Sequence, residues 1–292
     1  MSEATINQAP PAHSGALAAL RWISARRPRG FLPSLGIAIV AAILVLVFVV
    51  PFFANLDPYK FSYTAQLKPP SWAHPFGTDE LGRDYFARVL IGGRVSILVG
   101  LAIVALAAAI GVTFGAVAGF SGGVVDEVLM RIAEIFLAFP RIILALIIAG
   151  ALGPSVRNAV IAIAAGWWPA YARLVRGQVL TIREREYVAA ARSVGGRERK
   201  ILFRTVLPNS LAPLKVVFLL DVGPALVAAA TLSFFGLGVR EPKSEWGLLI
   251  QEAITQPGAW WLVVIPGLAI TLFAAGLNFA TGHTGENLFE RR

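Results

Sequence analysis

Six long apolar runs alternate with polar connections along the chain. A helix needs roughly 20 apolar residues to cross the hydrocarbon core of a bilayer, and each run is about that long. The runs are continuous and lack an alternation of period two, so they predict helices rather than the strands of a membrane barrel. The predicted spans are residues 34–53, 96–120, 128–149, 156–175, 211–235 and 261–280.

The composition supports a chain that lies in lipid. Hydrophobic residues make up 57% of the 292 positions and charged residues 15%. With Gly counted and Tyr left out, the apolar share is roughly 65%, against about 45–50% in soluble domains. A mean hydropathy of +0.69 implies more apolar surface than one soluble core can bury. The sequence therefore predicts an all-α membrane protein with six transmembrane helices.

The basic residues indicate which way the spans run. Residues 1–30 are polar and end in an arginine-rich stretch, and the apolar run that begins at residue 34 is too long for the core of a cleaved signal peptide. The connection after the fourth run holds nine Lys and Arg against three Glu between positions 173 and 204. Because basic residues are retained on the cytoplasmic side, both segments are expected there, together with the C-terminus. This orientation explains the net charge of +9, and no nucleic-acid partner is expected.

This topology divides the chain into a cytoplasmic tail, residues 1–33, and a transmembrane domain, residues 34–292. Two long connections, 54–95 and 236–260, carry balanced charges and are expected on the external side. The basic connection 177–209 is expected on the cytoplasmic side.

The polar segment between the fourth and fifth runs is too long for a simple turn. Residues 184–194 lack Gly and Pro and are rich in Ala, Arg and Glu, which predicts a short helix. Gly195 and Gly196 follow, and a residue free to adopt a positive φ there would end the helix and turn the chain. A second helical piece, 197–206, is expected to stop before Pro208. The composition leaves two roles open for this helix pair: docking against another protein or lying on anionic lipid.

Several short motifs in this chain occur together in one known family. In the segment just described, they comprise Glu186, Tyr187, Val188, Ala190, Ala191, Gly195, Leu207 and Pro208. Elsewhere they are FGTDELGRD at 76–84, LSFFGLG at 232–238, WG at 246–247, WW at 260–261 and PG at 266–267. The first set resembles the cytoplasmic EAA loop of ABC-importer permeases. The whole series, in this order, resembles the C-type permease of the dipeptide, oligopeptide and nickel ABC importers.

Three positions depart from the family pattern. Ala189 stands where a glutamate usually precedes the two alanines, so either Glu186 supplies the acidic contact or that contact is missing. Ala229 also replaces a frequent glutamate, and GHT at 282–284 stands in place of a Gly-Asp-Gly ending.

The resemblance implies a type I ABC-importer permease fold with cytoplasmic coupling helices. It also implies an ATP-driven importer of dipeptides and oligopeptides that works by alternating access in the bacterial cytoplasmic (inner) membrane. Nickel, glutathione or another small solute stay open as substrates. The implied partners are a second homologous permease, two cytoplasmic ATPases that bind ATP and Mg, a periplasmic or lipid-anchored solute-binding protein, and membrane lipid. The residues expected to couple the chain to an ATPase are Glu186, Tyr187, Ala190, Ala191, Gly195, Gly196, Leu207 and Pro208.

No catalytic, cofactor or metal site is predicted in the chain itself, so the subunit is not expected to be an enzyme. The sequence has no cysteine, its three His lie far apart, and no G-x-x-x-x-G-K-[ST] phosphate-binding loop occurs.

Asp221 lies about ten residues into the fifth run, where a carboxylate is costly and is therefore a functional candidate. Two roles stay open for it: an interior group that faces the second permease, or a group that lines the translocation path. The rival class of protein is a stand-alone secondary transporter or channel. Such a protein would show internal repeats and more buried ionisable groups than this sequence offers.

Overall fold

The computed structural model describes residues 31–54 and 56–289, and side chains as far as residue 281. Of the predicted cytoplasmic tail, 1–33, only the last three positions are described, and they belong to the first helix. In chain order the helices are α2 (Phe31–Leu44), α3 (Val50–Phe53), α4 (Tyr85–Ser121), α5 (Gly123–Leu137), α6 (Arg141–Leu152), α7 (Val156–Arg183), α8 (Glu186–Ser193), α9 (Glu198–Ile201), α10 (Leu207–Ser210), α11 (Ala212–Phe234), α12 (Trp246–Ala253) and α13 (Trp261–Phe289), with π-helical turns at Val45–Val49 and Leu202–Val206 and a 3₁₀ turn at Tyr63–Ala65.

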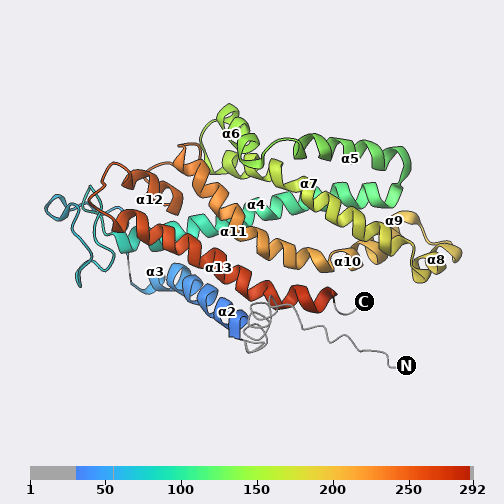
Figure 1. Cartoon of the computed structure of the whole chain (residues 1–292), viewed down its shortest axis with the longest axis horizontal. Helices are drawn as coiled ribbons and strands as arrows, with labels where there is room; N and C mark the ends of the chain where they lie inside the picture. The colour runs from blue at the N-terminus through green and yellow to red at the C-terminus, as the bar shows by residue number, and fades with distance from the viewer. Residues whose placement is uncertain (1–30, 55, 290–292) are drawn as a thin grey trace, which may run out of the picture.

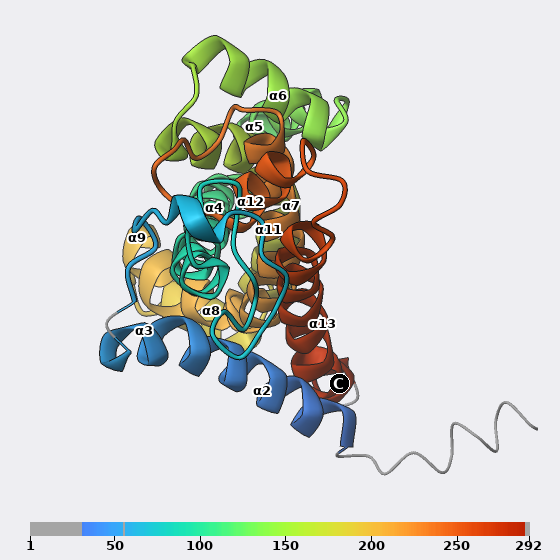
Figure 2. The same cartoon turned by 90° about the vertical axis from the view of Figure 1, so that its left-hand side faces the viewer.

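The long helices run roughly along the longest axis of the molecule (Figure 1). Helices α4 and α7 pack closely against each other, α6 packs on α7, and α2 packs on α13. Figure 2 shows α5 and α6 on one side of the bundle and α2 on the opposite side. Helices α8 and α9 lie at one end of the long axis, while α12 and the connection before α4 lie at the other (Figure 1). The two kinds of polar connection that the sequence places on opposite sides of the membrane are thus at opposite ends of the bundle.

The close approach of α4 to α7 depends on glycines at four-residue spacing. An added Cβ at Gly111 would lie 2.3 Å from Cβ of Tyr171, and one at Gly115 would lie 2.4 Å from the carbonyl oxygen of Ala172. Small residues at this spacing let helix backbones approach closely in membranes. The centre of the bundle is therefore fixed by backbone contact rather than by large side chains.

A proline near the end of the first span is accommodated by the π-helical turn Val45–Val49 and by an arginine of α4. Pro51 has no amide hydrogen and cannot donate to the carbonyl four residues earlier, at Val47. The Nε atom of Arg94 donates to that carbonyl at 2.8 Å, and its Nη2 atom donates to the Phe48 carbonyl at 3.1 Å. Arg94 therefore ties the first span to α4 through carbonyls exposed at the proline.

Four helical segments in the described residues are long and apolar enough to cross a bilayer: Phe31–Phe53, Tyr85–Ser121, Ala212–Phe234 and Trp261–Thr281. Helices α5 and α6 count as a fifth if a bent pair forms one span. The fourth predicted span, 156–175, lies in a helix, α7, but its polar residues keep it below the same apolarity criterion. The structure thus shows an all-helical membrane protein with four or five apolar spans.

Two predicted spans differ from the observed helices. The prediction of one continuous helix over 128–149 is wrong, because the chain bends by 88° between α5 and α6. Pro140 lacks an amide hydrogen and disfavours helical geometry in the residue before it, so α5 ends before the proline and α6 begins after it. Helix α4 starts eleven residues before the predicted span 96–120, at Tyr85. The Asp84 side chain caps it by accepting from the Ala87 amide at 3.0 Å.

Candidate functional site

The helix predicted over residues 184–194 is confirmed as α8, and a tight glycine corner ends it. The Gly196 amide donates to the Ala191 carbonyl at 3.0 Å, and the Gly195 amide donates to the Arg192 carbonyl at 2.9 Å. This pair of bonds is the Schellman motif, which requires a positive φ just after the helix cap, and Gly195 has a φ of 81°. An added Cβ at Gly196 would lie 2.5 Å from the Ala191 carbonyl oxygen. Both glycines are therefore needed, for different reasons.

Helix α8 buries one side and exposes the other. Val188 has no exposed surface and anchors the helix to the bundle. Glu186 and Ala190 are exposed, Ala191 is half-buried, and Tyr187 is 48% exposed. The candidate coupling residues of this helix therefore lie on a surface that another protein can reach.

An ion pair and a ring contact stiffen the corner after α8. The Nε atom of Arg192 donates to Oε1 of Glu198 at 3.1 Å, across the turn that joins α8 to α9. The same guanidinium lies 5.8 Å from the ring centroid of Phe120 at the end of α4. Val194, at the corner itself, is 85% exposed. The segment is thus a projecting element that is braced against the central helix.

The prediction that a helical piece stops before Pro208 is wrong. Helix α9 continues through the π-helical turn Leu202–Val206 into α10, and the Leu207 amide donates to the Leu202 carbonyl. The wider turn places Pro208 in the first turn of α10, where a missing amide hydrogen costs little. Leu207 and Pro208 consequently lie in a helix that packs on α7, and the structure does not bring them into the α8 corner.

Asp221 is half-buried on α11. Two side chains from other helices lie within electrostatic range of its carboxylate: Tyr171 of α7 and Arg141, the first residue of α6. The guanidinium carbon of Arg141 is 5.1 Å from the ring centroid of Trp167. Of these residues, the sequence analysis identified only Asp221. Arg141 had an available signal, because it is a charged residue that follows Pro140 in an apolar run.

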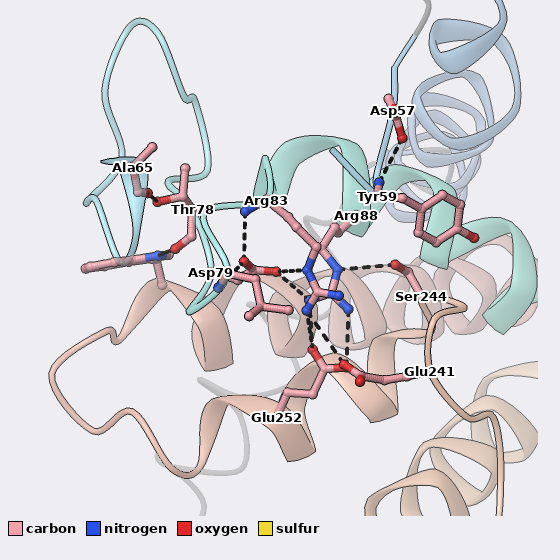
Figure 3. A network of polar contacts seen from close by, with 12 residues as sticks. Asp57, Tyr59, Ala65, Thr78, Asp79, Arg83, Arg88, Glu241, Ser244 and Glu252 are labelled. Atoms are coloured by element: carbon pink, nitrogen blue, oxygen red, sulfur yellow. Dashed lines mark hydrogen bonds and ion pairs between the residues drawn. The ribbon is translucent and has the colours of Figure 1, made fainter. Parts of the chain in front are cut away.

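A second group of charges lies where the connection before α4 meets α12 (Figure 3). Arg88 of α4 has no exposed surface, and its Nη1 atom donates to Asp79 Oδ2 and to Glu252 Oε2, each at 2.7 Å. Arg83 also donates to Asp79, and its Nη2 atom lies 3.6 Å from Glu241 Oε1. These contacts join the two connections that the sequence assigns to the external side.

Glu245 and Trp246 fasten α12 to α4 beside these charges. One carboxylate oxygen of Glu245 caps α12 by accepting from the Leu248 amide at 3.0 Å, and the other accepts from the Ser96 hydroxyl at 3.0 Å. The Trp246 amide donates to the same hydroxyl, and the indole Nε1 donates to the Val89 carbonyl at 2.9 Å. Hydrogen bonds therefore hold α12 against α4 at this end of the bundle. These contacts were not predicted from the sequence, because balanced charges are typical of an ordinary neutral loop.

Burial raises the pKa of Glu252 above its usual value, the hydrogen bonds from Arg88 oppose that shift, and Glu241 adds to it. Desolvation disfavours a charged carboxylate, and a nearby cation favours it. Arg88 is thus the group that opposes the rise in the pKa of this buried carboxyl.

A separate ion pair joins α5 to α7. The Nε and Nη2 atoms of Arg176 donate to the two carboxylate oxygens of Asp126 at 2.6 and 2.7 Å. Two-point contacts of this kind fix orientation as well as distance. Within the described residues, no three His, Asp or Glu side chains are grouped to hold a metal ion. The charged clusters described above join segments of this chain to one another.

A bundle of membrane helices with a projecting helical corner is compatible with a membrane transport component. Comparison with known proteins identifies the family. The family model described as binding-protein-dependent transport system inner membrane component matches residues 111–283. That match covers more than half of the chain, so the chain belongs to this family.

The chain also aligns with individual relatives over a longer stretch than the family model matches. It is 45% identical to the probable D,D-dipeptide transport system permease protein DdpC of Escherichia coli K12, over 83% of this chain and 81% of the relative. It is 39% identical to the dipeptide transport system permease protein DppC of Alkalihalophilus pseudofirmus, over 83% and 80%. It is also 39% identical to the glutathione transport system permease protein GsiD of Pectobacterium atrosepticum, over 83% of each chain.

Among solved structures, the chain is similar to one from the inward-facing MetNI methionine ABC transporter. The TM-score is 0.55 at 16% sequence identity, over 68% of this chain and 94% of that chain. The likeness shows that the two share a fold, that of an ABC-importer permease.

Proposed function

We propose that the chain is one transmembrane subunit of an ATP-driven importer that moves dipeptides and oligopeptides by alternating access. The observation that carries the proposal is the exposed, glycine-cornered α8 at one end of the bundle. The choice of peptides is supported by the relatives named for dipeptide transport. The subunit is proposed to transport without being an enzyme, because ATP and Mg would be bound by separate ATPases.

The proposed assembly has two permeases, two cytoplasmic ATPases and a solute-binding protein, which is periplasmic or anchored to lipid. In it, this chain crosses the bacterial cytoplasmic membrane six times, with α7 as a span and both termini in the cytoplasm. Polar residues along α7 are compatible with a span because α4, α5, α6 and α11 pack around it. The α8 corner then lies on the cytoplasmic side and the charge cluster around Arg88 on the external side.

In this assembly α8 transmits the movement of an ATPase to the bundle. Tyr187 supplies an aromatic anchor, Ala190 permits close approach of the partner, and Glu186 supplies the acidic contact that Ala189 cannot. Moving a two-state equilibrium from 1:99 to 99:1 requires about 5.5 kcal/mol of differential binding. The corner is held by the turn at Gly195 and Gly196 and by the ion pair between Arg192 and Glu198. It can transmit such a difference because it keeps its shape when the ATPase moves.

The proposal is tested by purifying the tagged chain from its native membrane in mild detergent. A second permease and two ATPases should accompany it, and peptide-loaded binding protein should stimulate ATP hydrolysis in the reconstituted complex. A chain that purifies alone and transports solute without nucleotide would overturn the proposal.

Glutathione is the second candidate substrate, because the glutathione permease GsiD covers as much of this chain as the dipeptide relatives do. The two candidates separate in proteoliposomes that contain the whole complex with its own binding protein. Under the main proposal, radiolabelled dialanine is taken up faster than radiolabelled glutathione at equal concentration. The reverse order would favour the second candidate.

A further inference from the structure

The break between α5 and α6 lies about halfway along the predicted membrane crossing of α7. The backbone at Arg141 packs against Gly166, where an added Cβ would lie 3.4 Å from the Arg141 carbonyl oxygen. Residues 138–140, at the break itself, are exposed in this chain. Irregular backbone at this depth of a bilayer is tolerated only against protein or beside a water-filled cavity. The break therefore faces another protein or an aqueous path.

The N-terminus of α6 at this break is a region of positive potential. No side chain caps it, and the amides from Arg141 to Ile143 have no acceptor in the part of the chain that the structure describes. Unpaired amides and the helix dipole together favour an anion. The exposed guanidinium of Arg141 adds a full positive charge at the same place.

Two buried donors near Arg141 make no hydrogen bond of ordinary geometry to the described residues. They are the indole Nε1 of Trp167 and the hydroxyl of Tyr171, on side chains that are 6% and 1% exposed. The Tyr171 hydroxyl faces the Asp221 carboxylate of α11. The Arg141 guanidinium lies over the Trp167 ring, at 5.1 Å from its centroid. An unpaired buried donor costs free energy, and native structures keep few of them. This pair therefore points to an acceptor that reaches them in another state of the bundle.

Asp221 completes the group with a negative charge. Its carboxylate lies within electrostatic range of Tyr171 and of Arg141. One region thus holds a guanidinium, a helix N-terminus, a carboxylate and two neutral donors. A short peptide presents the complementary groups, namely a carboxylate, an ammonium group and amide carbonyl oxygens.

We propose that Arg141, Trp167, Tyr171 and Asp221 form a polar station that binds the zwitterionic main chain of a short peptide during its passage through the membrane. Arg141 and the α6 N-terminus hold the carboxylate, and Asp221 accepts from the ammonium group. Trp167 and Tyr171 donate to carbonyl oxygens when movement of α6 uncovers them. The assignment rests on the proposed importer function and extends it by naming the chemistry that the path recognises.

Tyr171→Phe is the decisive variant, because it removes only a hydroxyl, which faces Asp221 but makes no hydrogen bond of ordinary geometry in this conformation. The test uses the whole complex in proteoliposomes, with its binding protein and radiolabelled dialanine in the L,L and D,D forms. The station predicts a fall of about two- to tenfold in peptides moved per ATP hydrolysed, the factor that one hydrogen bond supplies. Assembly of the complex should be unchanged. Unchanged transport by Tyr171→Phe would overturn the proposal.

Asp221→Asn and Arg141→Gln test the two charges against matched controls. Glu127→Gln and Arg157→Gln alter exposed groups that have no hydrogen bond or ion pair in the described structure, and they should transport normally. The two station variants should transport at least about tenfold less per ATP, since each removes a charged contact. The exchanged pair, Arg141→Asp with Asp221→Arg, should stay defective because the α6 N-terminus does not change sign. Restored transport in the exchanged pair would instead indicate an ion pair that only holds helices together.

The unaltered complex separates failure of the station from failure of the importer function. If it lacks ATPases or takes up no dialanine, the importer proposal fails whatever the variants do. If it transports and the station variants transport equally well, the importer proposal survives and the station is refuted.

Discussion

Gly195 and Gly196 make different demands on the corner after α8, and substitutions can separate them. Gly195→Val places a β-branched residue at a φ of 81°, which should destabilise the corner by about 1–2 kcal/mol. Gly195→Asn should be milder, since asparagine tolerates this conformation. The expected result is less copurified ATPase and lower transport for the valine variant than for the asparagine variant. Equal ATPase recovery from both variants would contradict a strained-backbone mechanism.

Arg94 shows how a single side chain can compensate for a proline in a span. Arg94→Gln removes two charged hydrogen bonds to the carbonyls of Val47 and Phe48 and should cost about 1.5–3 kcal/mol. In a Pro51→Ala background the chain regains an amide donor at position 51, so the same substitution should cost less. Thermal unfolding of the four proteins in detergent gives the coupling between the two positions. Additive losses would show that Arg94 does not compensate for the proline.

The ion pair between α5 and α7 should contribute more than a pair within one helix. Asp126 and Arg176 form a two-point contact whose side chains are 14% and 37% exposed. Asp126→Asn should therefore cost about 1–2 kcal/mol. Glu134→Gln is the control, because Glu134 pairs with Arg131 at 47% and 71% exposure, and its loss should cost at most about 0.5 kcal/mol. Equal shifts in melting temperature would show that α5 is not held to α7 by this contact.

The charge cluster that joins α4, α12 and the connection before α4 depends on Arg88. Arg88→Met leaves the carboxylates of Asp79 and Glu252 with Arg83 as their remaining cation, 3.7 Å from Glu252, and breaking a buried pair from one side costs about 3–5 kcal/mol. The double variant Arg88→Met/Glu252→Gln should recover part of that loss, because one of the two charges is removed. Thermal unfolding measures both proteins. A double variant less stable than the single one would contradict this account.

The Arg88→Met variant should also depend more strongly on pH. Burial raises the pKa of Glu252, and the substitution removes the groups that oppose the rise. Between the ordinary carboxyl pKa and the raised value, the folded state binds a proton that the unfolded state has released. Stability then falls as the pH rises through that window and returns on acidification. The gap in melting temperature to the unaltered chain should therefore be smaller at about pH 5 than at about pH 7.5.

The sequence predicts those elements whose signals are local. The first, second, fifth and sixth spans, α8 and its glycine corner follow from hydrophobic length, helix propensity and glycine conformation, and the structure contains all of them. The sequence alone could not show that Pro140 breaks a helix whereas Pro208 lies within one. Whether a proline breaks a helix depends on whether a π-helical turn can form beside it, and tertiary packing decides that.

The candidate sites divide in the same way. The exposed face of α8 is contiguous in sequence and could be predicted, whereas the cluster around Arg88 joins side chains more than 150 positions apart. Asp221 was found because a carboxylate in an apolar run is conspicuous, but its neighbours Arg141 and Tyr171 come from other helices. The unpaired indole Nε1 of Trp167, beside Arg141, is a property of packing that no single-sequence pattern records.

The whole molecule places its two polar ends far apart, which makes its orientation in the membrane testable. The chain contains no cysteine, so single cysteines can be introduced without background. Trp72, before α4, is fully exposed, and Val194, at the α8 corner, is 85% exposed. In intact inner-membrane spheroplasts a membrane-impermeant maleimide should label Trp72→Cys and leave Val194→Cys unlabelled.

Inside-out vesicles should reverse that pattern, and they also test the partner of α8. Val194→Cys should then be labelled quickly in vesicles stripped of peripheral proteins and slowly when the ATPases are bound, because a docked protein covers the corner. A Val124→Cys variant at the start of α5, before the predicted span and 75% exposed, is the control and should react at the same rate with and without ATPases. If Val194→Cys reacts from the same side as Trp72→Cys, the six-span topology is wrong. If its rate is the same with and without ATPases, the corner lies on lipid or in solvent, and α8 has no role in coupling.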